Sequence, residues 1–208
     1  VGAMMTRPDA AAPFTAVSSA LSSPPFHDGN WVAGITDTCL SPVSHCLATS
    51  AMLRRDPIGG LPDIDTRDQG GLLDVTVAED FADTRRVWIS FAQPREGGKT
   101  ATAVATATLS ADGGTLEGTE VIWQQQPAWD STMHYGSVLI HDGQGGLFVT
   151  TGERSVPDAR VLSQNVTTTL GKVVHLDPDT GAPMGDPGVA EALPEIWSWG
   201  HRNIQGAA

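Results

Sequence analysis

The sequence has few aromatic residues, few basic residues and almost no cysteine. Aromatic side chains make up 6% of the 208 residues, with a single tyrosine. Only 12 Lys and Arg stand against 24 Asp and Glu, which gives a formal net charge of −12. A surface of that sign repels phosphate backbones and matches anionic membranes poorly, so nucleic acid is not expected as a partner. The simplest explanation of the acidic excess is solubility.

Long apolar runs are also missing. No stretch approaches the roughly 18–20 residues that span a bilayer, so no membrane span is expected. Residues 1–20 lack the basic region and long apolar core of a signal peptide, which is therefore absent, already removed, or lost with a truncated end. With 40% hydrophobic and 17% charged residues, the chain has the composition of a globular domain with its own core.

Cys39 and Cys46 are the two cysteines. Their spacing permits a small disulfide loop in an oxidising compartment, and two unpaired thiols fit it about as well. His45 lies next to Cys46, but a second pair of metal ligands is missing. The sequence therefore assigns no metal ligands.

Glycine and proline, in contrast, are abundant, with 23 and 14 copies. They separate short segments in which apolar and polar residues alternate, which is typical of strands joined by turns. Residues 1–55 show no sustained period and stay unassigned, whereas 56–208 form one series. The expected strands are 72–78, 86–92, 100–109, 120–124, 136–141, 147–151, 170–176 and 195–199. This spacing predicts an all-β sandwich, barrel or propeller without choosing among them.

Four stretches in this order resemble a known family. The first joins 57–62 (PIGGLP) to 68–75 (DQGGLLDV), and the second joins 134–137 (HYGS) to 147–154 (LFVTTGER). The third is 170–173 (LGKV), and the fourth, the most specific, is 194–206 (PEIWSWGHRNIQG). Over about 57–208 the chain is similar to the soluble glucose and aldose sugar dehydrogenases that use pyrroloquinoline quinone (PQQ).

The resemblance implies an all-β fold of the six-bladed β-propeller family, of which residues 56–208 would form about half. It implies PQQ and calcium as cofactors. The reaction it implies removes the anomeric hydrogen of an aldose as hydride and gives the lactone. An aldose substrate and an external electron acceptor are the expected partners, with a possible homodimer, and a periplasmic or secreted location is expected.

The resemblance also implies roles for single residues. His134 matches the general base that acts on the C1 hydroxyl, a suitable task for a side chain that titrates near neutrality. Arg202 and Asn203 match residues that contact the quinone, where a fixed arginine stabilises developing negative charge. Gln69 matches a glutamine at the channel mouth. Gln164 matches another such glutamine more weakly, because the preceding loop varies in length.

Other polar and aromatic residues have simpler structural explanations. The following are assigned to hydrogen bonding within the fold or to its surface: Glu153, Arg154, Lys172 and His201. Blade packing is expected of Trp123, Trp197 and Trp199. Asp177, Pro178 and Asp179 form a turn rather than a calcium loop, because the remaining calcium ligands are missing.

Two positions depart from the family pattern. Met133 stands where glucose-oxidising members have an aspartate that orients the histidine, which predicts a weaker base. Val138 stands where the family usually has arginine, which removes a charge near the channel. These departures keep open a non-catalytic sugar-binding propeller, and, in third place, a calcium-dependent hydrolase of the lactonase type.

The two ends of the chain also differ from the pattern. Residues 10–55 lack the strand pattern of a first blade, and the chain stops soon after the Arg202-Asn203 pair. We therefore expect a fragment or a partly frame-shifted sequence. Half a ring would leave apolar faces and strand edges exposed, so the chain alone is expected to be poorly stable or to aggregate.

Overall fold

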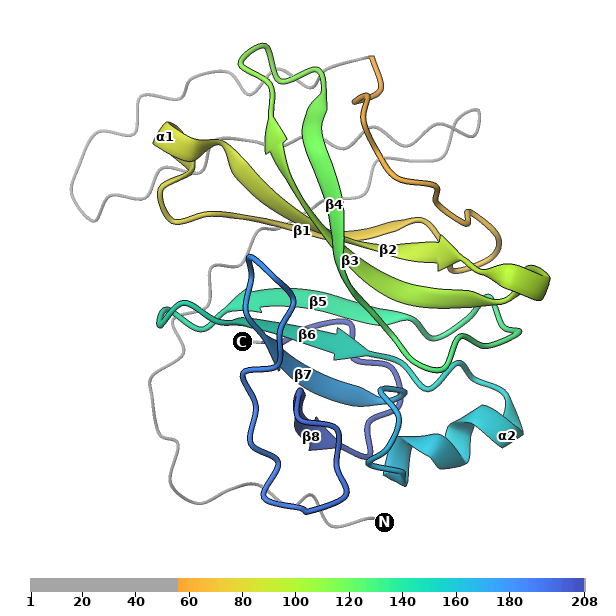
Figure 1. Ribbon diagram of the computed structural model, residues 1–208. Coiled ribbons are helices and arrows are strands. Elements are labelled where there is room, and N and C mark those ends of the chain that lie inside the picture. The colour runs from red at the N-terminus through yellow and green to blue at the C-terminus, as the bar shows by residue number, and fades with distance from the viewer. Residues whose placement is uncertain (1–55, 208) are drawn as a thin grey trace.

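A computed structural model describes residues 56–207 of the chain, and two four-stranded antiparallel sheets dominate it (Figure 1). The first sheet consists of β1 (Leu72–Val77), β2 (Arg86–Pro94), β3 (Thr100–Leu109) and β4 (Leu116–Gln124). The second consists of β5 (Gly136–His141), β6 (Leu147–Thr151), β7 (Lys172–Leu176) and β8 (Ile196–Trp199). Within each sheet, every strand pairs with its neighbour in the sequence. The all-β prediction is confirmed, whereas the boundary near residue 55 and the two cysteines fall outside the described residues.

The strands match the sequence prediction closely, with differences where the alternation is interrupted. β4 begins at Leu116 rather than at residue 120, because the β3–β4 pairing shifts register twice and Gly118 adopts a positive φ of 62°. Such bulges change which face a side chain meets, and so break the period of two. Four short helical turns within residues 56–207 were not predicted, because three or four residues are too few to show a helical period. They are α1 (Phe81–Thr84), η1 (Glu96–Gly98), α2 (Pro157–Arg160) and η2 (Val161–Gln164).

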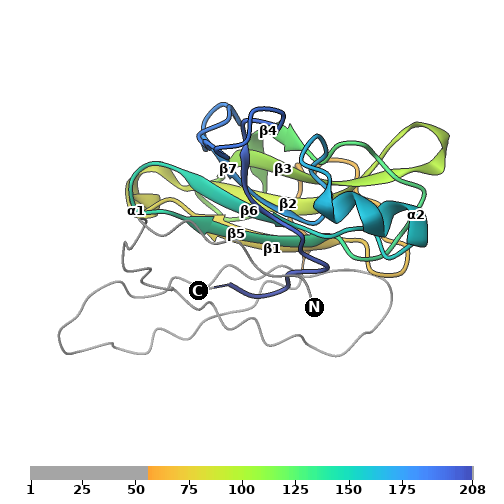
Figure 2. The ribbon, with the colours of Figure 1, turned by 90° about the horizontal axis from the view of Figure 1, so that it is seen from below.

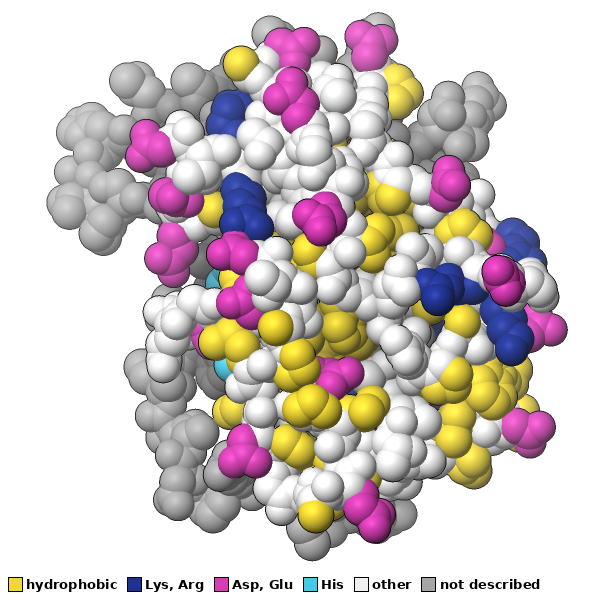
Figure 3. Space-filling model, viewed as in Figure 1, with side chains coloured by type: hydrophobic (Ala, Val, Ile, Leu, Met, Phe, Trp, Pro, Cys, Tyr) yellow, Lys and Arg dark blue, Asp and Glu magenta, His cyan; other side chains and the backbone are white. Residues whose placement is uncertain are grey.

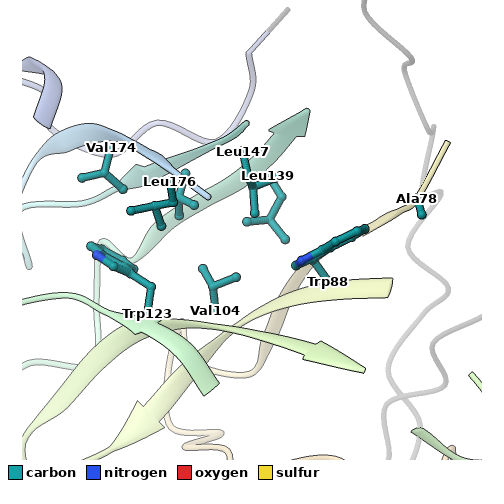
Figure 4. Close-up of a cluster of buried hydrophobic side chains, with 9 residues drawn as sticks. Ala78, Trp88, Val104, Trp123, Leu139, Leu147, Val174 and Leu176 are labelled. Carbon is teal, nitrogen blue, oxygen red and sulfur yellow. The ribbon is translucent and has the colours of Figure 1, made fainter. Parts of the chain in front are cut away.

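The two sheets stack face to face over a shared apolar layer (Figure 4). The first sheet contributes Ala78, Trp88, Val104 and Trp123, and the second contributes Leu139, Leu147, Val149, Val174 and Leu176. These residues alternate along their strands, as a face buried against a second sheet requires. The packing role expected of Trp123 is therefore confirmed, but Trp197 is 40% exposed and contacts Phe148 and His175 on the far face of the second sheet.

The first sheet is covered on its other face as well. Val87, Ile89 and Phe91 of β2 pack there with Ala103 and Ala105 of β3. Strand β3 is consequently buried on both faces, which its small Ala and Thr side chains allow.

Polar side chains tie the first sheet to β5. The Asp74 carboxylate accepts a bond from Leu139 N at 2.8 Å, and Ser90 Oγ donates to Ser137 O at 2.7 Å. Thr102 Oγ1 donates to Tyr135 O, also at 2.7 Å. Because each bond ends on backbone, the three together fix β5 relative to the first sheet without depending on a side-chain rotamer of β5.

Turn 177–181 docks the second sheet onto the first. Asp177 Oδ1 accepts bonds from Asp179 N and Thr180 N, which closes the turn and confirms the turn prediction. From the first sheet, Trp88 Nε1 donates to Pro178 O at 2.7 Å, while Arg86 forms an ion pair with Asp179. The turn is thus a contact between the sheets as well as a connection.

Gly181 in this turn provides the first prediction. Its φ is +68°, and a Cβ there would lie 1.9 Å from Ile122 O. We expect Gly181→Ala to lower the free energy of unfolding by about 2–4 kcal/mol, measured by urea denaturation with tryptophan fluorescence. Gly143→Ala is the matched control, since its φ is +70° and nothing lies within 4 Å of the added Cβ. The control should lose only about 1 kcal/mol, and equal losses would contradict the docking role.

The second view places α2 at one end of the strands, beside the connections that follow β6 (Figure 2). On the surface, Asp and Glu side chains are spread over the visible face, in keeping with the acidic composition (Figure 3). No helix within residues 56–207 has the length and apolar character needed to cross a membrane.

Candidate active site

The predicted site residues lie at one end of the second sheet, where strands begin and end. We call this end the edge. In an antiparallel sheet, the starts of β5 and β7 and the ends of β6 and β8 lie at the same edge. His134 precedes β5, whereas Arg202 and Asn203 follow β8. Gln69, just before β1, reaches the same edge because its backbone N donates to Thr132 O at 3.2 Å. Four of the five predicted residues are therefore brought together by hydrogen-bonded segments.

His134 forms the central contact of this edge with Glu153. Its Nδ1 lies 2.9 Å from Glu153 Oε1, and the two side chains are 15% and 1% exposed. Against an ionised carboxylate, which can only accept, a neutral imidazole places its proton on Nδ1. Nε2 is then left unprotonated, which is the form that a general base requires.

The backbone of His134 is held as firmly as its ring. Its N donates to Gln69 Oε1 at 2.9 Å, and Arg154 N approaches its O at 3.4 Å. Gly152 makes this close approach possible, because a Cβ there would lie 1.8 Å from His134 O. Gln69 thus contacts the backbone of the predicted base through its side-chain oxygen.

Backbone strain is concentrated at this edge. Among the described residues other than glycine, six have positive φ, and four of them are site residues or lie within two positions of one in the chain. These are Asp68 (46°), His134 (50°), Arg154 (69°) and Ser155 (64°). Left-handed conformations of such residues persist only where surrounding contacts enforce them, and they cluster at functional sites.

Arg202 and Asn203 complete the edge from the segment after β8. Glu153 N donates to Arg202 O at 2.9 Å, which fixes the backbone, while the side chain is 64% exposed with Nε 3.6 Å from Glu153 Oε1. Asn203 Oδ1 accepts a bond from Gly136 N at 3.0 Å. The amide oxygen is thereby used by the protein, and the NH₂ group is the end that can donate to a ligand.

Gln164 lies beside these residues rather than among them. It ends η2, and a Cβ at Gly200 would lie 2.8 Å from its Nε2, so its amide packs over the segment that leads to Arg202. His201 supports the same segment as expected: its Nε2 lies 2.8 Å from Ser198 Oγ and its N donates to Gly171 O. Burial, and then the charge of Lys172, lower the pKa of His201.

Arg154 supports the site from inside the protein. It is fully buried, its guanidinium lies 3.7 Å from the Tyr135 ring centroid, and its Nη2 donates to Thr100 Oγ1 and Ser131 O. Its Nε and Nη1 find no hydrogen-bond partner among the described residues. Arg154 therefore joins β3 of the first sheet to the segment that leads into His134, which is the structural role predicted for it.

Lys172 is also fully buried, and its Nζ donates to Leu162 O, Ser163 O and Leu170 O at 3.0, 2.9 and 2.6 Å. The predicted structural role is confirmed, since these bonds hold η2 and with it Gln164. Burial lowers the pKa of Lys172 to about 7.

That pKa gives a second prediction. The unfolded chain, with a lysine pKa of 10.5, binds a proton between pH 7 and 10.5 that the folded chain does not, so stability contributed by this group rises across that window. The slope is at most about 1.4 kcal/mol per pH unit. We expect urea unfolding curves to show this rise in the wild type and in Lys99→Met, an exposed control. It should be lost in Lys172→Met, and an unchanged slope there would contradict the assignment.

Glu153 is the site residue that the sequence interpretation missed. It was assigned to structural hydrogen bonding or the surface, yet its carboxylate contacts the predicted base. The expectation that Met133 leaves His134 without an orienting carboxylate is therefore wrong. The carboxylate comes from the end of the neighbouring strand, and Met133 is 41% exposed. The signal available was an acidic residue directly after a buried strand, paired in space with the residue before the adjacent strand.

Metal ligands were not predicted from the sequence. The part of the chain that the structure describes contains no group of three or more His, Cys, Asp or Glu side chains that could hold a metal ion.

Comparison with known proteins adds the evolutionary context. The family model described as Glucose / Sorbosone dehydrogenase matches residues 45–208. The chain is 38% identical over 154 residues to aldose sugar dehydrogenase YliI of Escherichia coli (strain K12), covering 73% of this chain and 41% of that protein. The chain thus spans about two fifths of the length of that curated relative.

Solved structures agree with the family match. The apo-form of the soluble aldose sugar dehydrogenase from Escherichia coli aligns with a TM-score of 0.65 and 37% identity, over 71% of this chain and 42% of that one. The PQQ-bound aldose sugar dehydrogenase from Streptomyces coelicolor aligns with a TM-score of 0.58 over 70% and 41%, and its 22% identity supports the fold alone. The two sheets therefore match part of sugar dehydrogenase propeller structures, and the chain belongs to the Glucose / Sorbosone dehydrogenase family.

Proposed function

We propose that the protein to which this chain belongs oxidises aldose sugars at C1 to the lactone, with PQQ as hydride acceptor and His134 as general base. The observation that carries this proposal is the 2.9 Å contact between His134 Nδ1 and the buried carboxylate of Glu153. It leaves Nε2 free to take the proton of a sugar hydroxyl. Family membership and the similarity to aldose sugar dehydrogenases support the substrate class.

The residues around His134 fit a ligand that is rich in acceptor oxygens. Arg202 presents an exposed guanidinium, and Gln69 and Asn203 use their amide oxygens within the protein, which leaves their NH₂ groups as donors. PQQ carries carbonyl and carboxylate oxygens, so these three residues would hold it, with Gln164 at the rim. Bound there, PQQ would supply the carbon that accepts the hydride.

The protein's own groups then have distinct tasks. Nε2 of His134 takes the hydroxyl proton as the C1 hydrogen leaves. Glu153 stabilises the imidazolium that results, because its buried carboxylate lies against Nδ1. Arg202 offsets negative charge that develops on the hydride acceptor. A fixed imidazole also limits the ways in which a sugar can be placed productively.

The wider context belongs to the same proposal. The two sheets would be neighbouring blades of a six-bladed propeller, and residues 56–208 would form part of that ring. Calcium would accompany PQQ, as the family resemblance implies. A periplasmic or secreted location, an external electron acceptor and a homodimer complete the expectation that the family resemblance gives.

The alternatives receive less support from the site. A non-catalytic sugar-binding propeller was favoured by Met133 and Val138. Glu153 supplies the carboxylate that Met133 does not. A lactonase-type hydrolase requires several carboxylates that converge on the channel, whereas the buried carboxylate at this edge is already engaged by His134. The dehydrogenase explains this pairing best.

The experiment is a titration of the purified protein with PQQ and calcium, followed by aldose-dependent reduction of a dye by the same sample. We expect saturable PQQ binding and dye reduction that requires both PQQ and aldose. Sugar binding without PQQ binding would favour the non-catalytic alternative. Hydrolysis of a lactone without dye reduction would favour the hydrolase.

A further inference from the structure

The segment after β6 closes on itself around the Glu153 carboxylate. Ser155 N donates to Glu153 Oε2 at 2.7 Å, and Arg160 Nη2 donates to Ser155 O at 2.9 Å. Arg160 Nε lies 4.0 Å from Glu153 Oε1, the same oxygen that contacts His134. Arg160 therefore completes a ring of contacts that begins and ends at Glu153.

The fold fixes the base of the Arg160 side chain. Arg160 ends α2, where its N donates to Val156 O at 2.9 Å. Pro157 occupies the first turn of this helix, where its fixed φ suits a helix start, and Ala159 is fully buried. The helical turn thus holds Arg160 beside Glu153 independently of any ligand.

Arg202 reaches the same carboxylate in a different way. Its side chain is more exposed than that of Arg160, at 64% against 47%, and its Nε lies 3.6 Å from Glu153 Oε1. Under the proposed function, Arg202 turns toward the bound quinone. Arg160 then remains the guanidinium beside Glu153, and the charge of the buried Arg154 also acts on it.

We propose that Arg160 is a positioning residue for the proposed reaction. It keeps Glu153 Oε1 directed at His134 Nδ1, which favours the tautomer that leaves Nε2 free. The physical reason is burial: a carboxylate that is 1% exposed is stable as an anion only with cationic and hydrogen-bonding partners. This inference rests on the proposed function for its catalytic meaning.

The test uses the chain itself, without quinone or sugar. Long-range ¹H–¹⁵N spectra report the tautomer of the His134 imidazole, which His134→Ala identifies among the histidine signals. We expect the Nδ1–H form to dominate in the wild type. In Arg160→Gln the ratio of Nδ1–H to Nε2–H should fall about three- to tenfold, the size expected when a hydrogen bond loses its support. Arg160→Lys keeps the charge without the two-point contact and should fall about twofold.

Arg95→Gln is the matched control for loss of a positive charge, because Arg95 is exposed and bonds to Gln93 and Gln124 in the first sheet. It should leave the ratio unchanged. Backbone amide spectra establish that each variant is folded. A wild-type ratio in both Arg160 variants would overturn the proposal. Failure of PQQ binding would instead count against the proposed function, since the tautomer is measured without PQQ.

Discussion

Replacement of His134 by alanine is expected to lower kcat for aldose oxidation by about 10²–10⁴-fold, the contribution typical of a positioned general base. Glu153 holds the imidazole of His134 at Nδ1, and Gln69 holds the backbone N of the same residue. Alanine removes the proton acceptor, but its backbone N can still donate to Gln69 Oε1. PQQ binding should therefore survive while turnover is lost, as measured by PQQ titration and dye reduction on the same samples.

Met133→Ala is the matched control for that experiment. Met133 is the preceding residue and its side chain is 41% exposed. Its truncation should change kcat by no more than a few-fold. If His134→Ala retained nearly full turnover, the general-base assignment would be wrong. If the control lost as much as His134→Ala, the loss would reflect displacement of the loop.

Arg154→Ala is expected to produce the largest loss of stability, about 3–5 kcal/mol in the free energy of unfolding. The substitution empties a large buried volume and removes the donor that bonds Thr100 and Ser131. It also removes the cation from the face of the Tyr135 ring. The measurement is urea unfolding at constant pH, followed by tryptophan fluorescence.

Arg154→Met separates volume from charge in this experiment. Methionine fills much of the same space without burying an ion, and the two guanidinium nitrogens that lack partners among the described residues disappear with it. Its loss should be about 1 kcal/mol or less. A loss equal to that of Arg154→Ala would mean that the polar contacts, rather than packing, hold the two sheets together here. The same unfolding curves test the expectation that the chain alone is poorly stable.

Much of the fold could be predicted because the relevant signals are local. Strand β3, for example, alternates Ala, Thr and Val almost without interruption, and turn 177–181 carries the Asp and Gly that close such turns. The start of β4 was predicted too late, because register shifts change the phase of the pattern. Such shifts depend on the partner strand, which a single segment does not specify.

The site was predictable only as far as single residues carry a motif. His134, Arg202 and Asn203 stand within family motifs, and the structure brings them to one edge of the second sheet. Glu153 carries no such signal, since its role depends on a partner 19 positions away and on its burial. The role proposed for Arg160 is harder still to predict from the sequence, because this residue lies in a one-turn helix that is too short to show a period.

The arrangement of the strands has a consequence for how the site comes into being during folding. Within each sheet, every strand pairs with its neighbour in the sequence, so each sheet can form from contacts of short range. Gln69, in contrast, stands before the first strand, and its contact with His134 requires both sheets to be in place. Arg202 follows the last strand and meets Glu153 within the second sheet. Closing the long loop between Gln69 and His134 costs chain entropy, which only the final contacts offset. A ligand that binds there stabilises the finished molecule alone, and its affinity is a measure of how complete the fold is.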